Sequence, residues 1–374
     1  MKKIRIFLVL ISAAVITNLT CVKVTAQQKD VIQMAILLDT SGSMDGLINQ
    51  AKSQLWKIVN ELASAKKNGA VPELQVALYE YGNDSNSSSE GYVRQIIPLT
   101  TDLDRVSEEL FKLTTNGGEE YCGEVIDRAV KALSWSRNRN DLKMIFIAGN
   151  EPFSQGSVDY KKSVRNSVTK GIIVNTIFCG DAKEGINTFW KDGADLGDGK
   201  YITINQDEEV AYIEAPQDAE IAKLGQELNS TYLAFGAAGA SAKKRQEKQD
   251  ANASEINEEV AVQRSIAKAS VQYKNSTWDM VDAVKENEVK IEDMKDSELP
   301  DEMKGMNAKE RKAYVEKMDK KRTEIQARIK KLSDEREKYI AKERAANAGK
   351  NTLDEAVLGA VREQANKKNY NFSK

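Results

Sequence analysis

Three oxygen-bearing side chains follow directly on an apolar run near the start of the chain. Residues 34–38 are Met-Ala-Ile-Leu-Leu, and Asp39, Ser41 and Ser43 come next at alternate positions. An apolar run without polar alternation predicts a strand that is buried on both faces. In open α/β sheets, ligands bind at the carboxyl ends of the strands. Carboxylate and hydroxyl oxygens suit a hard divalent cation such as Mg²⁺, so we expect a cation site here.

A simpler explanation exists for the same three side chains. Residues 45–67 have leucine, isoleucine and alanine at three- and four-residue spacing, which predicts an amphipathic helix. A carboxylate and two hydroxyls just before a helix could satisfy its free backbone N–H groups. The buried strand before the turn and the helix after it favour the cation site.

The elements that must position this turn alternate between strand and helix up to about residue 228. Such alternation predicts an α/β fold, with a doubly wound, mostly parallel sheet and helices on both faces. The polar loop 82–91 between two apolar runs predicts an antiparallel hairpin at the sheet edge. The predicted strands are residues 34–38, 74–81, 92–97, 143–148, 172–178 and 201–204, and the predicted helices between them are 45–67, 102–113, 124–134, 160–170, 185–196 and 216–228.

The composition changes after residue 236. Residues 237–250 begin with small side chains and predict a linker. Residues 251–374 predict a charged α-helical region. From residue 241 to the end, the chain has 30 basic and 26 acidic residues. Segments 255–274 and 277–293 predict helices that pair with a third, and residues 353–366 predict a further amphipathic helix. We expect a helical hairpin or coiled-coil-like arrangement. The third helix has a heptad seam with two arginines, formed by Val315, Met318, Arg322, Ile325, Ile329, Leu332, Arg336 and Tyr339. Asn307 and Glu310 are spaced as its capping box.

The first 26 residues have the pattern of a secretory signal peptide. Three basic residues precede an apolar run at 6–16, and a small-residue cleavage site ends at Ala26. The run is too short to cross a bilayer, which takes about 20 residues. Cleavage predicts a periplasmic or secreted protein, and lipid attachment at Cys21 is the competing interpretation.

The remaining two cysteines, Cys122 and Cys179, both lie near predicted C-terminal strand edges. In an oxidising compartment they predict one disulfide. The alternative is a pair of buried, unpaired thiols.

The Asp-Thr-Ser-Gly-Ser-Met sequence at Asp39, Ser41 and Ser43 resembles the metal-ion-dependent adhesion site of von Willebrand factor type A (VWA) domains. The resemblance covers about residues 30–236 and implies a Mg²⁺, Mn²⁺ or Ca²⁺ site that binds an acidic group of a protein partner. The family usually has a threonine after a Gly-Gly pair, where this chain has Glu119. Glu119 either ligates the ion and lowers its electrophilicity, as in relatives with an acid there, or points into water.

The third element of the family pattern is usually an aspartate after the central strand. Here Asn150 stands as a neutral substitute, or Glu151 as a displaced acid. We assign Asn150 to the expected ligand set, together with Asp39, Ser41, Ser43 and Glu119.

Composition argues against an enzyme, a nucleotide-binding protein and a nucleic-acid-binding protein. The chain has no histidine, which removes the usual general base, and no Gly-x-x-x-x-Gly-Lys phosphate loop. Its net charge is −2, without a basic stripe. We expect a periplasmic or secreted protein-binding module whose helices dock or self-associate. The alternatives are an envelope scaffold with a vestigial site and an accessory subunit of an envelope enzyme complex.

Overall fold

The computed structural model describes residues 29–204, 212–346 and 353–372. The predicted signal peptide and Cys21 lie outside these residues. Among the residues described, no helix is both long enough and apolar enough to traverse a bilayer.

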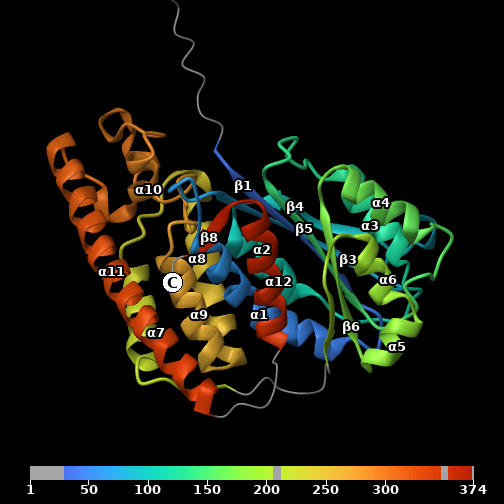
Figure 1. The fold of residues 1–374 in the computed structure, drawn as a ribbon. Helices are drawn as coiled ribbons and strands as arrows, with labels where there is room; N and C mark the ends of the chain where they lie inside the picture. Colours follow the sequence, from blue (N-terminus) through green and yellow to red (C-terminus); the bar gives the residue numbers. More distant parts are fainter. Residues whose placement is uncertain (1–28, 205–211, 347–352, 373–374) are drawn as a thin grey trace, which may run out of the picture.

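The centre of the molecule is a six-stranded sheet with the order β4-β3-β1-β5-β6-β7 (Figure 1). Every neighbouring pair is parallel except β3 and β4, so the antiparallel edge predicted from the sequence is confirmed. The α/β fold class is confirmed as well. The strands are β1 (Val31–Asp39), β3 (Glu73–Tyr81), β4 (Arg94–Thr100), β5 (Leu142–Gly149), β6 (Ile173–Cys179) and β7 (Tyr201–Ile204).

Both faces of the sheet are covered, because β1 and β5 are apolar on both sides. Ile32 and Met34 enter the core on one face, and Ala35 and Leu37 enter the core on the other. The first face carries α1 (Asp45–Ala63) and α2 (Leu103–Lys112). The second carries α3 (Cys122–Ala132), α4 (Tyr160–Thr169), α5 (Ala182–Asn187) and α6 (Trp190–Leu196). The cap of α2 is Asp102, whose side chain accepts a hydrogen bond from Arg105 N.

The predicted disulfide is wrong. Cys122 and Cys179 are both free and buried. Cys122 belongs to the core on the α3 face and Cys179 to the core on the α1 face, so the sheet separates their side chains. The sequence places both near strand ends, but the alternation of side chains along β6 decides which face Cys179 occupies.

The helices that follow the sheet pack on its α1 face (Figure 1). The predicted linker at residues 237–250 is wrong, because these residues are helical within α8. The alanine, lysine, arginine, glutamine and glutamate residues of α8 favour a helix, and they outweigh the glycines and serine near its start. The helical elements are α7 (Asp218–Asn229), α8 (Gly236–Ile256), α9 (Glu258–Ala269), α10 (Met280–Lys285), α11 (Ala308–Ala346) and α12 (Leu353–Lys367), with short 3₁₀ turns at Ser88–Glu90, Ile291–Asp293, Asp296–Glu298 and Asp301–Met303.

Polar contacts join these helices to α1 and α2. Asn60 Nδ2 in α1 donates to the Gln263 carbonyl in α9 at 2.9 Å. Ser107 Oγ in α2 donates to Gln249 Oε1 in α8 at 3.0 Å. The helical region therefore shares an interior with the sheet and does not hang from it as a separate tail.

The seam of α11 faces inward as the heptad spacing predicts, and packs mainly on α7 and α9. Both seam arginines pair with buried aspartates. Arg322 Nη1 lies 2.7 Å from Asp279 Oδ2, and Arg336 Nε lies 2.6 Å from Asp218 Oδ1. The predicted capping box is confirmed, since Asn307 and Glu310 exchange hydrogen bonds of 2.8 and 3.0 Å.

The C-terminal segment returns to the first part of the chain. Apolar side chains of α12 join the core of β1, and β8 (Tyr370–Phe372) pairs antiparallel with β2 (Ala65–Lys67). Asn175 in β6 and Gln364 in α12 exchange two buried hydrogen bonds of 3.1 and 2.6 Å. The helix at residues 353–366 is confirmed, and its docking against β6 is a finding of the structure.

Candidate metal centre

Asp39 is the last residue of β1, the strand that pairs with both β3 and β5. Its carboxylate is fully buried. Oδ1 accepts a hydrogen bond from Ser41 N at 2.8 Å, while Oδ2 has no hydrogen-bond partner. A buried carboxylate oxygen without a partner is costly, so this atom requires an explanation.

The two serines of the turn differ in their surroundings. Ser41 is buried and its Oγ has no hydrogen-bond partner, whereas Ser43 is exposed. The α1 helix begins at Asp45, and the side chain of its cap residue, Met44, makes no capping hydrogen bond. Because Ser41 Oγ has no hydrogen-bond partner, helix capping does not account for Ser41.

Asn150 follows β5 and reaches the same turn. Its Nδ2 donates to Ser43 Oγ at 3.2 Å, and its Oδ1 is buried without a partner. Glu151 is exposed, and its backbone oxygen accepts from Trp190 Nε1 at 2.8 Å. Of the two candidates in this turn, the structure brings the side chain of Asn150 to Ser43.

The loop between α2 and α3 carries Glu119, the ligand expected from the sequence. Glu119 is exposed and accepts from Gln155 Nε2 at 3.3 Å. The neighbouring Glu120 is buried instead, and sequence reasoning missed it. The loop is held by Asn116 N, which donates to the Thr40 carbonyl at 3.0 Å. Gly118 packs so tightly that a β-carbon there would collide with the Gly82 carbonyl, so the next two side chains are directed by this contact.

Two carboxyl groups at this edge have unusual pKa values. Burial raises the pKa of Asp39 to about 7, and the charge of Glu151 adds to the rise. Burial also raises the pKa of Glu120 to about 7, with the charge of Asp39 as the next cause. No cationic side chain is among the main causes of either pKa shift. The site thus has uncompensated negative charge, which a bound cation would neutralise.

The donor set fits a hard cation. Three buried oxygens lack partners, namely Asp39 Oδ2, Ser41 Oγ and Asn150 Oδ1. No cluster of three His, Cys, Asp or Glu side chains with metal-binding spacing occurs in the described part of the chain. The donors are mostly neutral oxygens, which suits Mg²⁺, Mn²⁺ or Ca²⁺ better than a soft metal.

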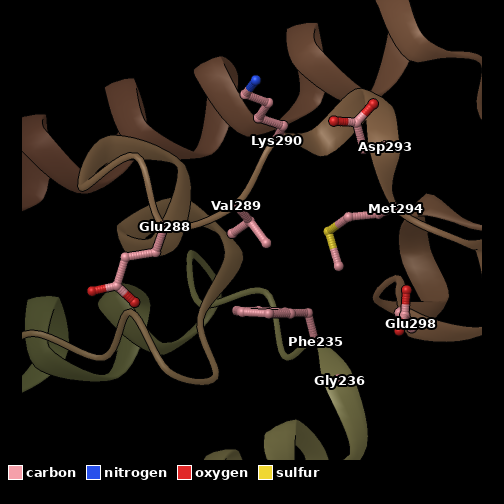
Figure 2. A pocket seen from close by; sticks show the side chains of 8 residues that line it. All are labelled: Phe235, Gly236, Glu288, Val289, Lys290, Asp293, Met294 and Glu298. Atoms are coloured by element: carbon pink, nitrogen blue, oxygen red, sulfur yellow. The ribbon is translucent and has the colours of Figure 1, made fainter.

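A cavity of about 370 Å³ lies elsewhere, beside the turn between α10 and α11. Figure 2 shows Val289 and Met294 directed toward the ring of Phe235, with the Glu288 carboxylate pointing away. None of its described lining residues has a buried polar atom without a partner. Three buried polar atoms without a partner lie at the edge at Asp39, and none of those identified in the described residues lies in this cavity.

Several solved structures resemble this chain over less than half of its length. Curated proteins give no match. Similar solved structures include BatB from Bacteroides thetaiotaomicron, at 16% identity over 46% of this chain and 90% of that one, with a TM-score of 0.35. An aerotolerance-related membrane protein from Bacteroides fragilis aligns at 17% identity over 47% and 92%, with a TM-score of 0.32. Proximal thread matrix protein 1 from the mussel byssus, solved "with zinc occupied MIDAS motif", aligns at 15% identity over 48% and 43%, with a TM-score of 0.35.

The family comparison covers the sheet and the candidate site. Residues 33–210 match the model of the von Willebrand factor type A domain. This range contains Asp39, Ser41, Ser43 and Asn150, and five of the six strands lie wholly within it. This part of the chain is a von Willebrand factor type A domain.

Proposed function

We propose that this chain binds a protein partner through a divalent cation held at the turn after β1. The proposed ligands are Asp39, Ser41, Ser43 and Asn150. The observation that carries the proposal is the group of three buried, unpartnered oxygens at Asp39, Ser41 and Asn150. Three such atoms at one sheet edge would each cost free energy, and one cation relieves all three.

The ligand set indicates how a partner would be held. Asp39 is the only charged member of the set, so a bound Mg²⁺, Mn²⁺ or Ca²⁺ would retain positive charge and water. An acidic side chain of the partner could replace one water. Asn150 is neutral where the family usually has an aspartate, which keeps the charge of these four ligands low. The residues of this chain would position the cation and partly neutralise its charge. The proposed activity is therefore binding of a partner, not catalysis.

We further propose that the mature protein is periplasmic or secreted. The proposal depends on the signal-peptide pattern of residues 1–26. The charged surface of the long α11 helix is a further candidate for docking or self-association. Its buried seam is already occupied by α7 and α9.

Thermal unfolding with increasing Mg²⁺ or Mn²⁺ tests the cation site. A native state that binds an ion gains stability with ion concentration, by about 2.7 kcal/mol at 100 times the dissociation constant. The gain should vanish in Asp39→Ala and persist in Glu119→Ala, whose side chain is exposed. A parent protein whose unfolding midpoint does not move at millimolar ion would contradict the proposal and favour the scaffold alternative.

A further inference from the structure

Glu120 brings a second carboxylate to the place where the Asp39 carboxylate lies. The position that a β-carbon on Gly82 would take is 2.8 Å from Glu120 Cγ and 2.9 Å from Asp39 Oδ1. The same point is 3.6 Å from Ser41 Cβ. Gly82 has a φ of +76° and no side chain, so its backbone leaves this space to the three polar residues.

The position of Glu120 is fixed by its backbone. Glu120 N donates to Gln155 Oε1 at 3.1 Å, and its carbonyl accepts from Cys122 N at 3.2 Å, at the start of α3. The Glu120 side chain is 7% exposed. A surface carboxylate that happened to lie near Asp39 would be far more exposed and free to turn away.

Several other buried carboxylates in the described part of the chain are paired with arginine, while the buried Asp141 accepts hydrogen bonds from Val31 N and Ser136 Oγ instead. Asp104 lies 2.6 Å from Arg264, and Asp218 and Asp279 have arginine partners on α11. Asp39 and Glu120 form no such ion pair with any residue that the structure describes. Two ionised buried acids side by side without a cation are unfavourable, and this charge is relieved either by protonation or by a bound metal ion.

We propose that Glu120 is a second anionic ligand of the divalent cation and competes with the acidic group of a partner. This inference rests on the proposed function of the same site. With Asp39 and Glu120 both present, the chain neutralises the ion itself. The ion is held more tightly, and it attracts a further carboxylate less. The acidic group of a partner must therefore either displace Glu120 or bind an ion whose positive charge Glu120 has partly neutralised. This makes Glu120 a specificity-determining residue.

The test uses Mn²⁺ as the metal and acetate as the probe for an acidic group. Glu120→Gln keeps the size of the side chain and removes its charge. We expect its affinity for Mn²⁺, measured by calorimetry, to fall on the order of tenfold or more. The water-proton relaxation of bound Mn²⁺ should rise, because a water replaces the lost ligand. Acetate should then suppress that relaxation at a lower concentration than in the parent protein.

The matched control is Glu119→Gln, one residue earlier, with the same change of charge at an exposed side chain. Its Mn²⁺ affinity should stay within about twofold of the parent, because exposed charges are screened. Thermal unfolding without metal shows whether Glu120→Gln is folded. If it is not, Glu120→Asp keeps the charge, shortens the side chain and should show an intermediate loss of affinity.

The outcomes separate the two proposals. If the parent protein binds no Mn²⁺, the proposed function fails, and the inference fails with it. If the parent binds Mn²⁺ but Glu120→Gln matches it in affinity, relaxation and acetate response, only the role of Glu120 is overturned. A fall in affinity without any change in acetate response supports Glu120 as a ligand and overturns the competition with a partner.

Discussion

Asn150 donates a hydrogen bond of 3.2 Å to Ser43 Oγ, and this contact joins the end of β5 to the turn after β1. The pair brings together two strand ends that are about 110 residues apart in the chain. The amide oxygen of Asn150 is left buried and without a partner. An aspartate in the same place would present a charged oxygen instead.

Asn150→Asp should therefore raise the affinity for Mn²⁺, by about tenfold, because ligand charge sets the affinity of oxygen sites. Without metal the same variant should unfold at a lower temperature, since a further acid would join Asp39, Glu120 and Glu151. Calorimetry with Mn²⁺ and thermal unfolding in chelator measure the two effects. Asn150→Ala is the control, and it should lose affinity. An Asn150→Asp protein that binds Mn²⁺ no better than the parent would remove Asn150 from the ligand set.

A bound cation should change how the stability of the protein depends on pH. The pKa values of Asp39 and Glu120 are about 7 in the folded protein, against ordinary values of 3.8 and 4.5. Without metal, the folded state therefore holds more protons than the unfolded state between these values. The stability that the two groups contribute is present at low pH and is lost as the pH rises through about 7. A cation binds the ionised forms, so its stabilising effect should grow over the same range.

Unfolding midpoints at about pH 5 and pH 8, with chelator and with Mn²⁺, test this prediction. The increment that Mn²⁺ adds should be larger at the higher pH. Asp39→Asn should remove most of the increment at both. Equal increments in the parent protein at the two pH values would show that these carboxyls do not control binding.

Local sequence patterns predict the strands, the turn at Asp39 and the seam of α11, because each follows from residue order and burial alone. The position of Glu120 does not follow from them. It depends on the contact of Gly118 with the Gly82 carbonyl, and the two glycines are far apart in sequence. The same holds for the cysteines, whose side chains enter cores on opposite faces of the sheet. The family spacing pointed to Glu119, one residue from the side chain that the fold buries.

The arginines on the α11 seam should anchor that helix. Arg322 is buried and pairs with Asp279 at 2.7 Å and with Asp282 at 2.8 Å. Arg322→Met would leave Asp279 as an uncompensated buried charge, and we expect a loss of about 3–5 kcal/mol in the free energy of unfolding. Denaturant titration measures the loss.

Arg328 on the same helix is the matched control for Arg322. It pairs with Glu220 at 2.6 Å, but its side chain is 63% exposed. Arg328→Met should cost about 0–1 kcal/mol, as exposed ion pairs do. Similar losses for Arg322→Met and Arg328→Met would show that the buried pair does not anchor α11. Adding Asp279→Asn to Arg322→Met should recover part of the loss, because the stranded charge is then removed.

The pair of Asn175 and Gln364 should couple the C-terminal helix to the sheet. Gln364→Ala removes both hydrogen bonds between β6 and α12 and leaves Asn175 Nδ2 buried without its partner. A stranded buried donor costs about 1–3 kcal/mol. Lys367→Ala, at the exposed end of α12, should cost less than about 1 kcal/mol and serves as the control. Chemical denaturation of Gln364→Ala, of Asn175→Ala and of the double variant completes a double-mutant cycle. A coupling energy near zero would mean that α12 rests on the sheet through its apolar side chains alone.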